Sequence, residues 1–485
     1  MFNRYFSRFL NSAVMFVLFF ALIMSIIYVG YFFYISNNKI FCVLTLVFYF
    51  FIFIIYRKYK NKIAEVLDFN NEKVIVFIII AALIIRVFWV INIPTNPTSD
   101  FGLMYKSAAD VAKGQFYMFK DNSYFARFAH DTITVLYFSL FYHLTNNPLP
   151  LIKLLNIIYE TASVFLLYLV IKEAIGKKSA IIGSIIMTVF PAYIMYTSEA
   201  MSENIALPFY LLSVYLFLKA FKNNNRNTFL FLCGLSLSIG NMFRMVGEVF
   251  LIAFIMYLLI YKGFKEGLKS SIKIIISFTL LLVLVSQTLI STGITEVQLW
   301  NSKEPAITSI LKGTNIAHYG RWNKEDASIP YKFNYDPKAI KEASKKIIIQ
   351  RLTETPIYKV AFHYVVKLAT QWGLGDFGAY GWSVEDADNT NAASFMKYAK
   401  SEINILSNLI YISLLIRILI AMYKREYEDF EKMNFFFILF GGFVLLYLIT
   451  ETQERYGFIA AWLLVIFAVR NRNVCNIPAR KHITI

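Results

Sequence analysis

Ionisable side chains lie at the edges of several long apolar segments. Asp100 is the first acid after the apolar stretch 74–91, and the intervening residues contain two prolines and show no helical period. Charged groups beside hydrocarbon are costly, so a gathering of them predicts a functional site. The candidates are Asp100, Lys106, Asp110, Arg127, His130, Asp131, Glu199, Glu203, Arg244, Glu451, Glu454 and Arg455.

This mixture of residue types suits the chemistry of a lipid-linked phosphate at a membrane surface. Arg can hold a phosphate through two parallel hydrogen bonds, and Lys can hold it as a point charge. A carboxylate can remove the proton from an attacking hydroxyl or amine, so that a sugar carbon is attacked as the phosphate leaves. Plainer interpretations stand beside this one. An Asp before a helix caps it, and Lys or Arg at an interface extends toward headgroups.

The elements that would position these residues are membrane helices. The chain has 485 residues, of which 58% are hydrophobic and 16% charged, whereas soluble domains carry about a quarter charged residues. Several apolar runs exceed the roughly 18 residues that cross a bilayer. The fold class predicted is an all-α polytopic membrane protein. About twelve spans are expected, near 11–35, 40–56, 74–91, 150–171, 179–196, 203–221, 227–243, 245–261, 274–292, 404–422, 433–449 and 456–470.

The distribution of basic residues predicts the orientation of these spans. With the N-terminus in the cytoplasm, the inner loops each carry several Lys or Arg, and the short outer loops carry at most one each. Both termini are then cytoplasmic, and the first apolar run is an uncleaved span rather than a signal peptide. The formal net charge of +17 follows from these loops, so no nucleic-acid partner is predicted. Cys42, Cys233 and Cys475 show neither a pairing pattern nor a metal spacing, so no disulfide and no metal site are expected.

Two longer segments, 92–149 and 293–403, fall on the outer side in this topology. Residues 132–144 are too short to span the membrane and too apolar to be free, so they predict a helix in the interface. Residues 355–372 look similar, with Lys359, His363 and Lys367 at helical spacing. The second segment is expected to form a small extracytoplasmic cap.

Several motifs, taken in order, resemble those of the GT-C glycosyltransferases, in particular the group of protein O-mannosyltransferases and the aminoarabinose transferase of lipid A. In that superfamily an early outer loop begins with an acid directly after a span, as in PTSDFGLMYKSAADVAKG here. YTSEAMSENIALPFY resembles a span that begins with Ser-Glu, and LSIGNMFRMVGEVF and TETQERYGFIAAW resemble Arg-bearing helix ends. The resemblance is scattered over 74–470. It departs from the family where Phe101 follows a single acid and where His130 and Asp131 replace a usual proline.

The resemblance implies a role for each candidate residue. Asp100 would be the general base, and the donor phosphate would be bound by Lys106, Arg127, Arg244 and Arg455. The supporting residues would be His130, Asp131, Glu203, Glu451 and Tyr456. If Asp100 lies inside a helix, Lys106 points away from it, because six residues rotate about 240° beyond a full turn. Glu451 and Arg455 have the spacing of a helical ion pair, which could also orient Arg455 toward a phosphate.

The implied function is an inverting glycosyltransferase of the bacterial plasma membrane, with its active site on the outer face. Its partners would be the bilayer, a polyprenyl-phosphate sugar donor and an acceptor that is a glycan, a lipid or a protein, with no cofactor. The expected parts are an extra hairpin and basic loop (1–73), a catalytic core (74–292), the cap (293–403) and C-terminal spans with a basic tail (404–485). The alternative is a transporter, flippase or polymerase of lipid-linked glycans. Transporters place charge near the midplane of broken helices, whereas charges here gather at one face.

Overall fold

The computed structural model describes residues 2–66, 73–222, 226–424 and 431–469, and within these ranges its elements are all helical. Cys475, most of the basic tail and parts of three predicted inner loops lie outside the described residues. The longest helices are α1 (Phe2–Ile35), α2 (Lys39–Val66), α3 (Lys73–Asn92), α7 (Leu149–Ala174), α13 (Phe264–Ser291), α21 (Lys400–Tyr423) and α22 (Glu431–Ile449).

These seven helices are long and apolar enough to cross a membrane. An eighth candidate is the bent pair formed by α8 (Lys177–Val189) with α9 (Pro191–Met195) and η3 (Tyr196–Ser198), which turn by 60° at Pro191. Pro lacks a backbone N–H and clashes with the preceding turn, which explains the break. The chain is therefore an all-helical, multi-pass membrane protein.

The predicted number of twelve spans is not confirmed. The other four predicted spans correspond to α10 (Ser202–Ala220), α11 (Arg226–Phe243), α12 (Gly247–Tyr261) and η4 (Glu454–Ala460) with α23 (Trp462–Ala468), and they are too short or too polar for the same criterion. Almost every residue of α10 is buried, and α10 packs against α7 and α11. A helix surrounded by other helices need not be apolar on all sides, so hydropathy alone does not settle these four.

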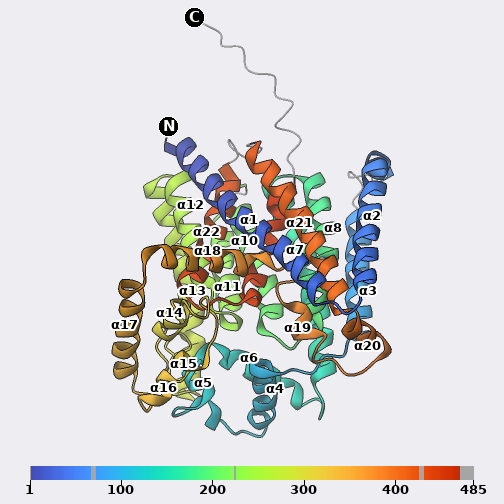
Figure 1. The fold of residues 1–485 in the computed structure, drawn as a ribbon. Helices are drawn as coiled ribbons and strands as arrows, with labels where there is room; N and C mark the ends of the chain where they lie inside the picture. Colours follow the sequence, from blue (N-terminus) through green and yellow to red (C-terminus); the bar gives the residue numbers. More distant parts are fainter. Residues whose placement is uncertain (1, 67–72, 223–225, 425–430, 470–485) are drawn as a thin grey trace, which may run out of the picture.

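The short helices lie mainly at the end of the bundle away from the start of α1 (Figure 1). They belong to the two predicted outer segments. The first contains α4 (Ser99–Ala112), η1 (Tyr117–Phe119), α5 (Tyr124–Arg127), η2 (Ala129–Asp131) and α6 (Thr132–Tyr142). The second contains α14 (Ile307–Gly313), α15 (Lys324–Ala327), α16 (Ile329–Lys332), α17 (Pro337–Glu354), α18 (Ile357–Gly373), α19 (Ala379–Ser383) and α20 (Asn391–Tyr398).

The predicted amphipathic helix in the cap is α18, which runs across the bundle rather than along it (Figure 1). Its charged residues do not all face an interface, because His363 and Lys367 are each 1% exposed. The Lys367 ammonium donates to the carbonyls of Gly313, Leu448 and Thr450, each at 2.8 Å. Lys367 therefore joins the cap helix α14 to the end of α22.

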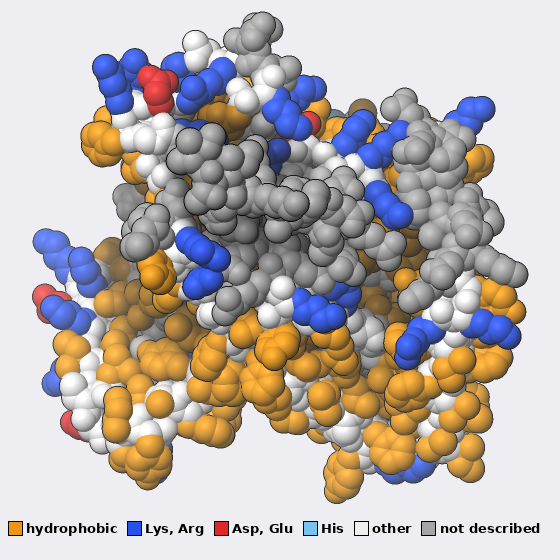
Figure 2. All heavy atoms as spheres, turned by 90° about the horizontal axis from the view of Figure 1, so that it is seen from above, with side chains coloured by type: hydrophobic (Ala, Val, Ile, Leu, Met, Phe, Trp, Pro, Cys, Tyr) orange, Lys and Arg blue, Asp and Glu red, His pale blue; other side chains and the backbone are white. Residues whose placement is uncertain are grey.

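The two N-terminal helices differ in how they join the bundle. The helix α1 packs against α18, α21 and α22, whereas α2 contacts chiefly α21 and leaves most of its apolar side chains exposed. Such exposed apolar surface on a membrane helix is the surface that lipid would cover. At the end that carries the N-terminus, Lys and Arg side chains far outnumber Asp and Glu (Figure 2).

Candidate active site

Asp100 is the second residue of α4, so its carboxylate sits at the helix N-terminus just beyond α3. The first turn is tight, because a Cβ on Gly102 would approach the Pro97 carbonyl oxygen to 2.7 Å. Ser99 adopts a φ of 48°, a left-handed conformation that non-glycine residues rarely take. Such backbone strain is maintained where the surrounding structure fixes it, often at functional sites.

The segment before Asp100 is held by the outer end of the cap. The Asn96 amide donates to the Asp386 carbonyl at 3.0 Å, and the Asp388 amide donates to the Pro94 carbonyl at 3.1 Å. The Thr98 hydroxyl donates to the Asp386 carboxylate at 2.7 Å. These bonds join the two outer segments directly beside Asp100.

The Asp100 carboxylate has two neighbours and an open side. The Tyr124 hydroxyl donates to Oδ1 at 2.8 Å, and Arg455 Nη2 lies 4.0 Å from Oδ2. The Asp100 side chain is 46% exposed, whereas that of Arg455 is 6% exposed. A substrate can therefore reach the carboxylate. Tyr124 orients it, and Arg455 is too far away to form a close ion pair with it.

Arg455 is a buried cation with unused hydrogen-bonding capacity. Its guanidinium lies 4.6 Å from the ring centroids of both Phe101 and Trp382. Its Nε and Nη1 atoms are buried and have no hydrogen-bond partner among the described residues. Buried donors without partners are costly, so an anion placed beside these two atoms would stabilise them. Aromatic faces partly offset the cost through cation–π contacts.

A second arginine lies close to the first. Arg244 Nη1 is 3.5 Å from Glu203 Oε1, and its guanidinium lies 5.1 Å from the ring centroid of Tyr456. The same tyrosine ring is 5.6 Å from the Arg455 guanidinium. The structure therefore brings together Asp100, Glu203, Arg244, Arg455 and Tyr456, from α4, α10, the end of α11 and η4.

Asp131 is at the edge of this cluster, in η2, and its carboxylate is 3.7 Å from His130 Nε2. Burial raises the pKa of the Asp131 carboxyl, and His130 and Arg244 partly oppose the shift. The negative charges of Asp100 and Glu203 raise the pKa of Asp131 further. The acids of the site are thus near enough to disfavour one another's charge.

Two predicted phosphate ligands are placed elsewhere. Lys106 is exposed on α4, and because Asp100 lies inside this helix it does not share Asp100's face. Arg127 donates through Nε and Nη2 to Glu304 Oε2, at 3.1 and 2.6 Å. Neither cation is brought to the cluster around Arg455.

The interpretation of Glu451 and Arg455 as a helical ion pair is wrong. Residues 451–453 are not helical, and η4 begins only at Glu454. Glu451 Oε2 instead lies 2.6 Å from Lys312 Nζ of α14, and Glu451 Oε1 accepts from the Tyr456 hydroxyl at 3.4 Å. Glu451 therefore anchors the cap to the loop that carries Arg455.

Sequence reasoning missed Tyr124, Phe101 and Trp382. Phe101 follows the predicted base directly, and Trp382 lies on the short helix α19 within a Gly- and Asp-rich stretch of sequence, where an aromatic residue is a usable signal. Tyr124 has no such signal, because the chain must fold back from α5 onto α4 before its hydroxyl reaches Asp100. Long-range contacts of this kind are not encoded in local spacing.

Glu199 is fully buried behind the cluster. Its Oε1 accepts from the Ala200 amide at 2.9 Å, while Oε2 has no hydrogen-bond partner among the described residues. Burial raises the pKa of the Glu199 carboxyl to about 8, although the Ala200 amide and the charge of Lys153 oppose the shift. Glu199 is therefore mainly protonated at neutral pH.

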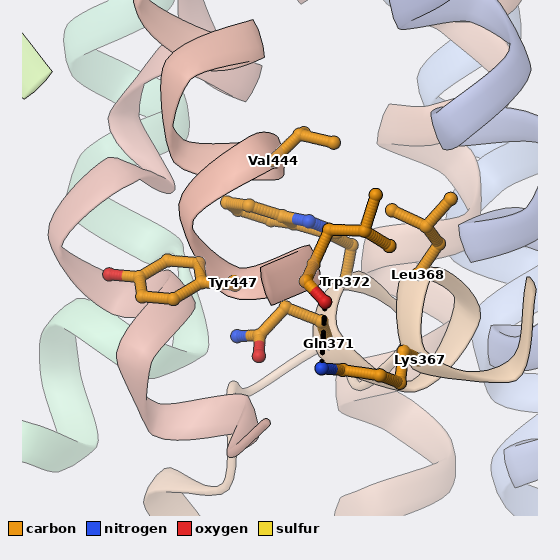
Figure 3. Close-up of a pocket in the computed structure, with 7 residues that line it drawn as sticks. Lys367, Leu368, Gln371, Trp372, Val444 and Tyr447 are labelled. Atoms are coloured by element: carbon orange, nitrogen blue, oxygen red, sulfur yellow. Dashed lines mark hydrogen bonds between the residues drawn. The ribbon is translucent and has the colours of Figure 1, made fainter. Parts of the chain in front are cut away.

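A narrow pocket between α18 and α22 has no room for a water molecule (Figure 3). It is lined by Lys367, Leu368, Gln371, Trp372, Val444, Tyr447 and Leu448. The Lys367 ammonium is bonded to the Leu448 carbonyl there (Figure 3). None of the predicted site residues lines this pocket, so it is separate from the candidate active site.

The fold and the cluster define a multi-pass helical membrane protein with acids and arginines gathered at one end of its bundle. Residues 132–290 match the family model described as dolichyl-phosphate-mannose-protein mannosyltransferase. This match covers about a third of the chain and lies within the part that carries the predicted resemblance to the GT-C glycosyltransferases. No curated protein sequence matches the chain.

Two solved structures are similar to the chain at low identity. The first is the archaeal oligosaccharyltransferase AglB from Archaeoglobus fulgidus, in complex with an inhibitory peptide and a dolichol-phosphate. It is 11% identical, with a TM-score of 0.48, over 83% of this chain and 50% of AglB. The second is ArnT from Cupriavidus metallidurans bound to undecaprenyl phosphate, 11% identical, with a TM-score of 0.34, over 81% of this chain and 76% of ArnT. The chain thus spans about half the length of AglB.

Proposed function

We propose that the protein is a membrane glycosyltransferase that transfers a sugar from a polyprenyl-phosphate donor to an acceptor on the outer face of the membrane. The observation that carries this proposal is Arg455: a buried guanidinium with open donors, 4.0 Å from a half-exposed carboxylate. Arginine donors suit a phosphate, and a neighbouring carboxylate suits a proton acceptor. The ligands in AglB and ArnT, dolichol-phosphate and undecaprenyl phosphate, are of the same chemical class.

In the proposed reaction, an acceptor hydroxyl or amine attacks the anomeric carbon of the donor sugar. Asp100 takes the acceptor's proton as the new bond to carbon forms. The bond between the anomeric carbon and the phosphate oxygen breaks, and the electron pair leaves with the lipid phosphate. Arg455 stabilises the charge on this phosphate and Arg244 assists it. A single displacement inverts the configuration of the sugar carbon.

Each side chain of the cluster has a part in this scheme. Tyr124 orients Asp100 and leaves Oδ2 facing the donor site. Glu203 sets the direction of Arg244, and the ring of Tyr456 lies near both guanidiniums. Lys106 and Arg127 are left out of the phosphate site, because one is exposed and the other is paired with Glu304.

Sidedness and span number are also proposals. The excess of Lys and Arg at the end that carries the N-terminus supports a cytoplasmic location for that end (Figure 2). The cluster lies toward the opposite end of the bundle, which supports an extracytoplasmic active site. We keep twelve spans in this proposal, with α10, α11, α12 and α23 counted among them, and the plasma membrane as the location.

The test is a screen of purified protein in nanodiscs with a panel of radiolabelled undecaprenyl-phosphate sugars and a crude cell-envelope acceptor. Transfer of label from one donor to the acceptor supports the proposal and identifies the sugar. A second arm reconstitutes the protein in vesicles loaded with the same donors on one leaflet. Donor translocation between leaflets without transfer of sugar would contradict the proposal and establish a carrier.

A further inference from the structure

The chain between α22 and η4 leads to Arg455 and is bonded to the cap along its length. Residues 450–453 are not helical, and we call 450–455 the Arg455 loop. A stretch without secondary structure takes its path from bonds to other parts of the chain. The partners in the cap are Lys367 for the Thr450 carbonyl, Ser309 and Lys312 for Glu451, Gly320 for the Thr452 amide, Gln371 for the Gln453 carbonyl and Arg321 for the Glu454 carboxylate.

Lys367 of α18 is the central residue of this junction. Its side chain is buried, and Nζ donates to the carbonyls of Gly313, Leu448 and Thr450, each at 2.8 Å. The last carbonyls of a helix have no partner within that helix, and Leu448 and Thr450 lie at the end of α22. Lys367 therefore supplies hydrogen bonds that the end of α22 lacks, and it ties this end to α14.

Gln371 bonds the far end of the Arg455 loop from the same face of α18. It lies one turn after Lys367, and its Nε2 donates to the Gln453 carbonyl at 2.8 Å. Between these two contacts, the Thr452 amide donates to the Gly320 carbonyl at 2.8 Å. Successive points of the loop are thus held by α18 and by the segment that follows α14.

The backbone of the cap is in close contact with the loop and with Lys367. A Cβ on Gly313 would approach the Thr450 carbonyl oxygen to 2.5 Å. A Cβ on Gly320 would approach Lys367 Cε to 2.8 Å. Glycine at these two positions allows the approach, so the loop has little room to move toward the cap.

The same cap also holds the segment that leads to Asp100. The Thr95 hydroxyl in this segment donates to the Ser383 carbonyl at 2.7 Å. Trp382 precedes Ser383, and its ring centroid lies 4.6 Å from the Arg455 guanidinium. One continuous part of the chain therefore contacts both halves of the candidate active site.

We propose that the cap sets the position of the Arg455 guanidinium relative to the Asp100 carboxylate, and that Lys367 and Gln371 are positioning residues for sugar transfer. Both act through the Arg455 loop, because they bond to its backbone. Arg455 directly follows the bonded residues, so a looser loop lets its guanidinium leave its place 4.0 Å from Asp100. A misplacement of about 1 Å can lower a rate on the order of 100-fold. This consequence for transfer rests on the proposed function.

The first test is hydrogen–deuterium exchange of the peptide that covers 450–456, measured on the full chain in nanodiscs without substrate. Lys367→Met removes all three bonds of Nζ. Exchange of this peptide should then rise roughly tenfold, because the bond from the Thr452 amide to the cap opens more often. Exchange at the wild-type rate in a folded Lys367→Met variant would overturn the role of Lys367.

Lys359→Met is the matched control for this measurement. It makes the same change on the same helix, at a position where the side chain is exposed. Exchange of 450–456 should stay at the wild-type rate in this variant. An increase as large as that in Lys367→Met would contradict a specific role for Lys367.

Gln371→Met tests the same proposal with less disturbance of folding. It removes a single bond to the loop, whereas Lys367→Met leaves three carbonyls without this donor. Gln371 Oε1 is buried without a hydrogen-bond partner among the described residues, so Met also removes an unsatisfied acceptor. The unfolding midpoint should stay near that of wild type while exchange of 450–456 rises several-fold. Wild-type exchange in this variant would overturn the role of Gln371.

The last measurement is of kcat and donor KM with the donor identified in the screen. In Lys367→Met and Gln371→Met, kcat should fall roughly tenfold. Donor KM should change less, because Arg455 acts mainly on the charge that develops on the phosphate as the bond breaks. Lys359→Met should keep the wild-type kcat.

Two outcomes separate this proposal from the proposed function. An unaltered kcat in a variant whose loop exchange has risen would refute positioning. If the wild type turns over no donor, the proposed function fails instead, and the exchange rates still decide whether the cap holds the Arg455 loop.

Discussion

Arginine is paired with acids at different distances in two regions of the molecule. One region is the active-site cluster, and the other is the junction where Arg127 of the first outer segment meets Glu304 of the cap. In the cluster, Arg455 stays 4.0 Å from Asp100 and keeps two donors open. In the junction, Arg127 donates twice to Glu304, at 3.1 and 2.6 Å. Both arginines lie on the outer side of the predicted topology, and both were candidates for binding a phosphate.

The same contrast holds for a second pair of ion pairs. Arg244 lies 3.5 Å from Glu203 in the cluster, whereas Lys312 lies 2.6 Å from Glu451 where the cap meets the loop after α22. A closely paired cation has its charge neutralised and its donors used. A loosely paired one can still bind an anion. Pairing distance and open donors, rather than residue type, therefore distinguish candidate ligand-binding groups from structural ones.

The largest expected effect comes from removing the open guanidinium. Arg455→Met should lower transfer on the order of 10²–10³-fold, the loss typical of one preorganised donor to a developing charge. The measurement is kcat/KM with the donor identified in the screen. Arg127→Met is the matched control, because it removes an equal charge from the closely paired region, and it should retain most activity. Equal losses of activity in the two variants would show that Arg455 is no more important for transfer than the closely paired Arg127.

Tyr124→Phe should have an intermediate effect. The variant removes the hydrogen bond to Asp100 Oδ1 but leaves the half-exposed carboxylate in place. Losing this hydrogen bond should cost about 1.4 kcal/mol of stabilisation of the reacting carboxylate, which lowers kcat roughly tenfold. Donor KM should change little, because Tyr124 does not touch the phosphate site. A loss as complete as that of an Asp100 variant would mean that Tyr124 itself takes part in proton transfer.

Arg127→Gln should affect stability rather than catalysis. Glu304 is largely buried, so leaving it without its partner should cost about 1–3 kcal/mol of unfolding free energy. A lower unfolding midpoint with near-normal kcat would sharpen the comparison. Glu304→Gln should give a similar shift, since it breaks the same pair from the other side. Unchanged stability in both variants would show that the pair is not structural.

Glu199→Gln should change the pH dependence of stability rather than activity. The Glu199 carboxyl has a pKa of about 8 when folded, above its unfolded value, so the folded state holds a proton that the unfolded state loses. Stability of the wild type should therefore fall as pH rises through the window between the two values, by at most roughly 1.4 kcal/mol per pH unit. The Gln variant should lack this part of the slope. Identical pH profiles would contradict a buried, protonated Glu199.

The sequence predicted the membrane class and the order of most helices. Of its candidates for one site, Asp100, Glu203, Arg244 and Arg455 lie together, whereas Lys106 and Arg127 lie elsewhere, and the roles of all six remain predictions. These follow from long apolar runs and from charges at their ends, both of which are local features. It could not predict the partners Glu304 and Lys312, because each comes from the cap and meets a residue far away in the chain. Spacing alone also suggested a helix over 451–455, where the chain instead leaves α22 at Ile449 and begins η4 only at Glu454.

The number of spans shows a similar limit. Hydropathy identifies α2 and α3, which expose apolar surface, more readily than α10, whose face toward its neighbours includes Glu203 and Asn204. Inner helices carry the polar groups of a site and so lose the apolar signal that marks a span. The division of the chain into four parts remains a prediction.

The central claim is that Asp100 acts as the general base beside Arg455. The most direct measurement is release of sugar from the radiolabelled donor in nanodiscs, compared between wild type and Asp100→Asn. In the variant, the rate of sugar release should fall on the order of 10²–10⁴-fold, while the unfolding midpoint and donor binding stay unchanged. Transfer by Asp100→Asn at the wild-type rate would contradict it.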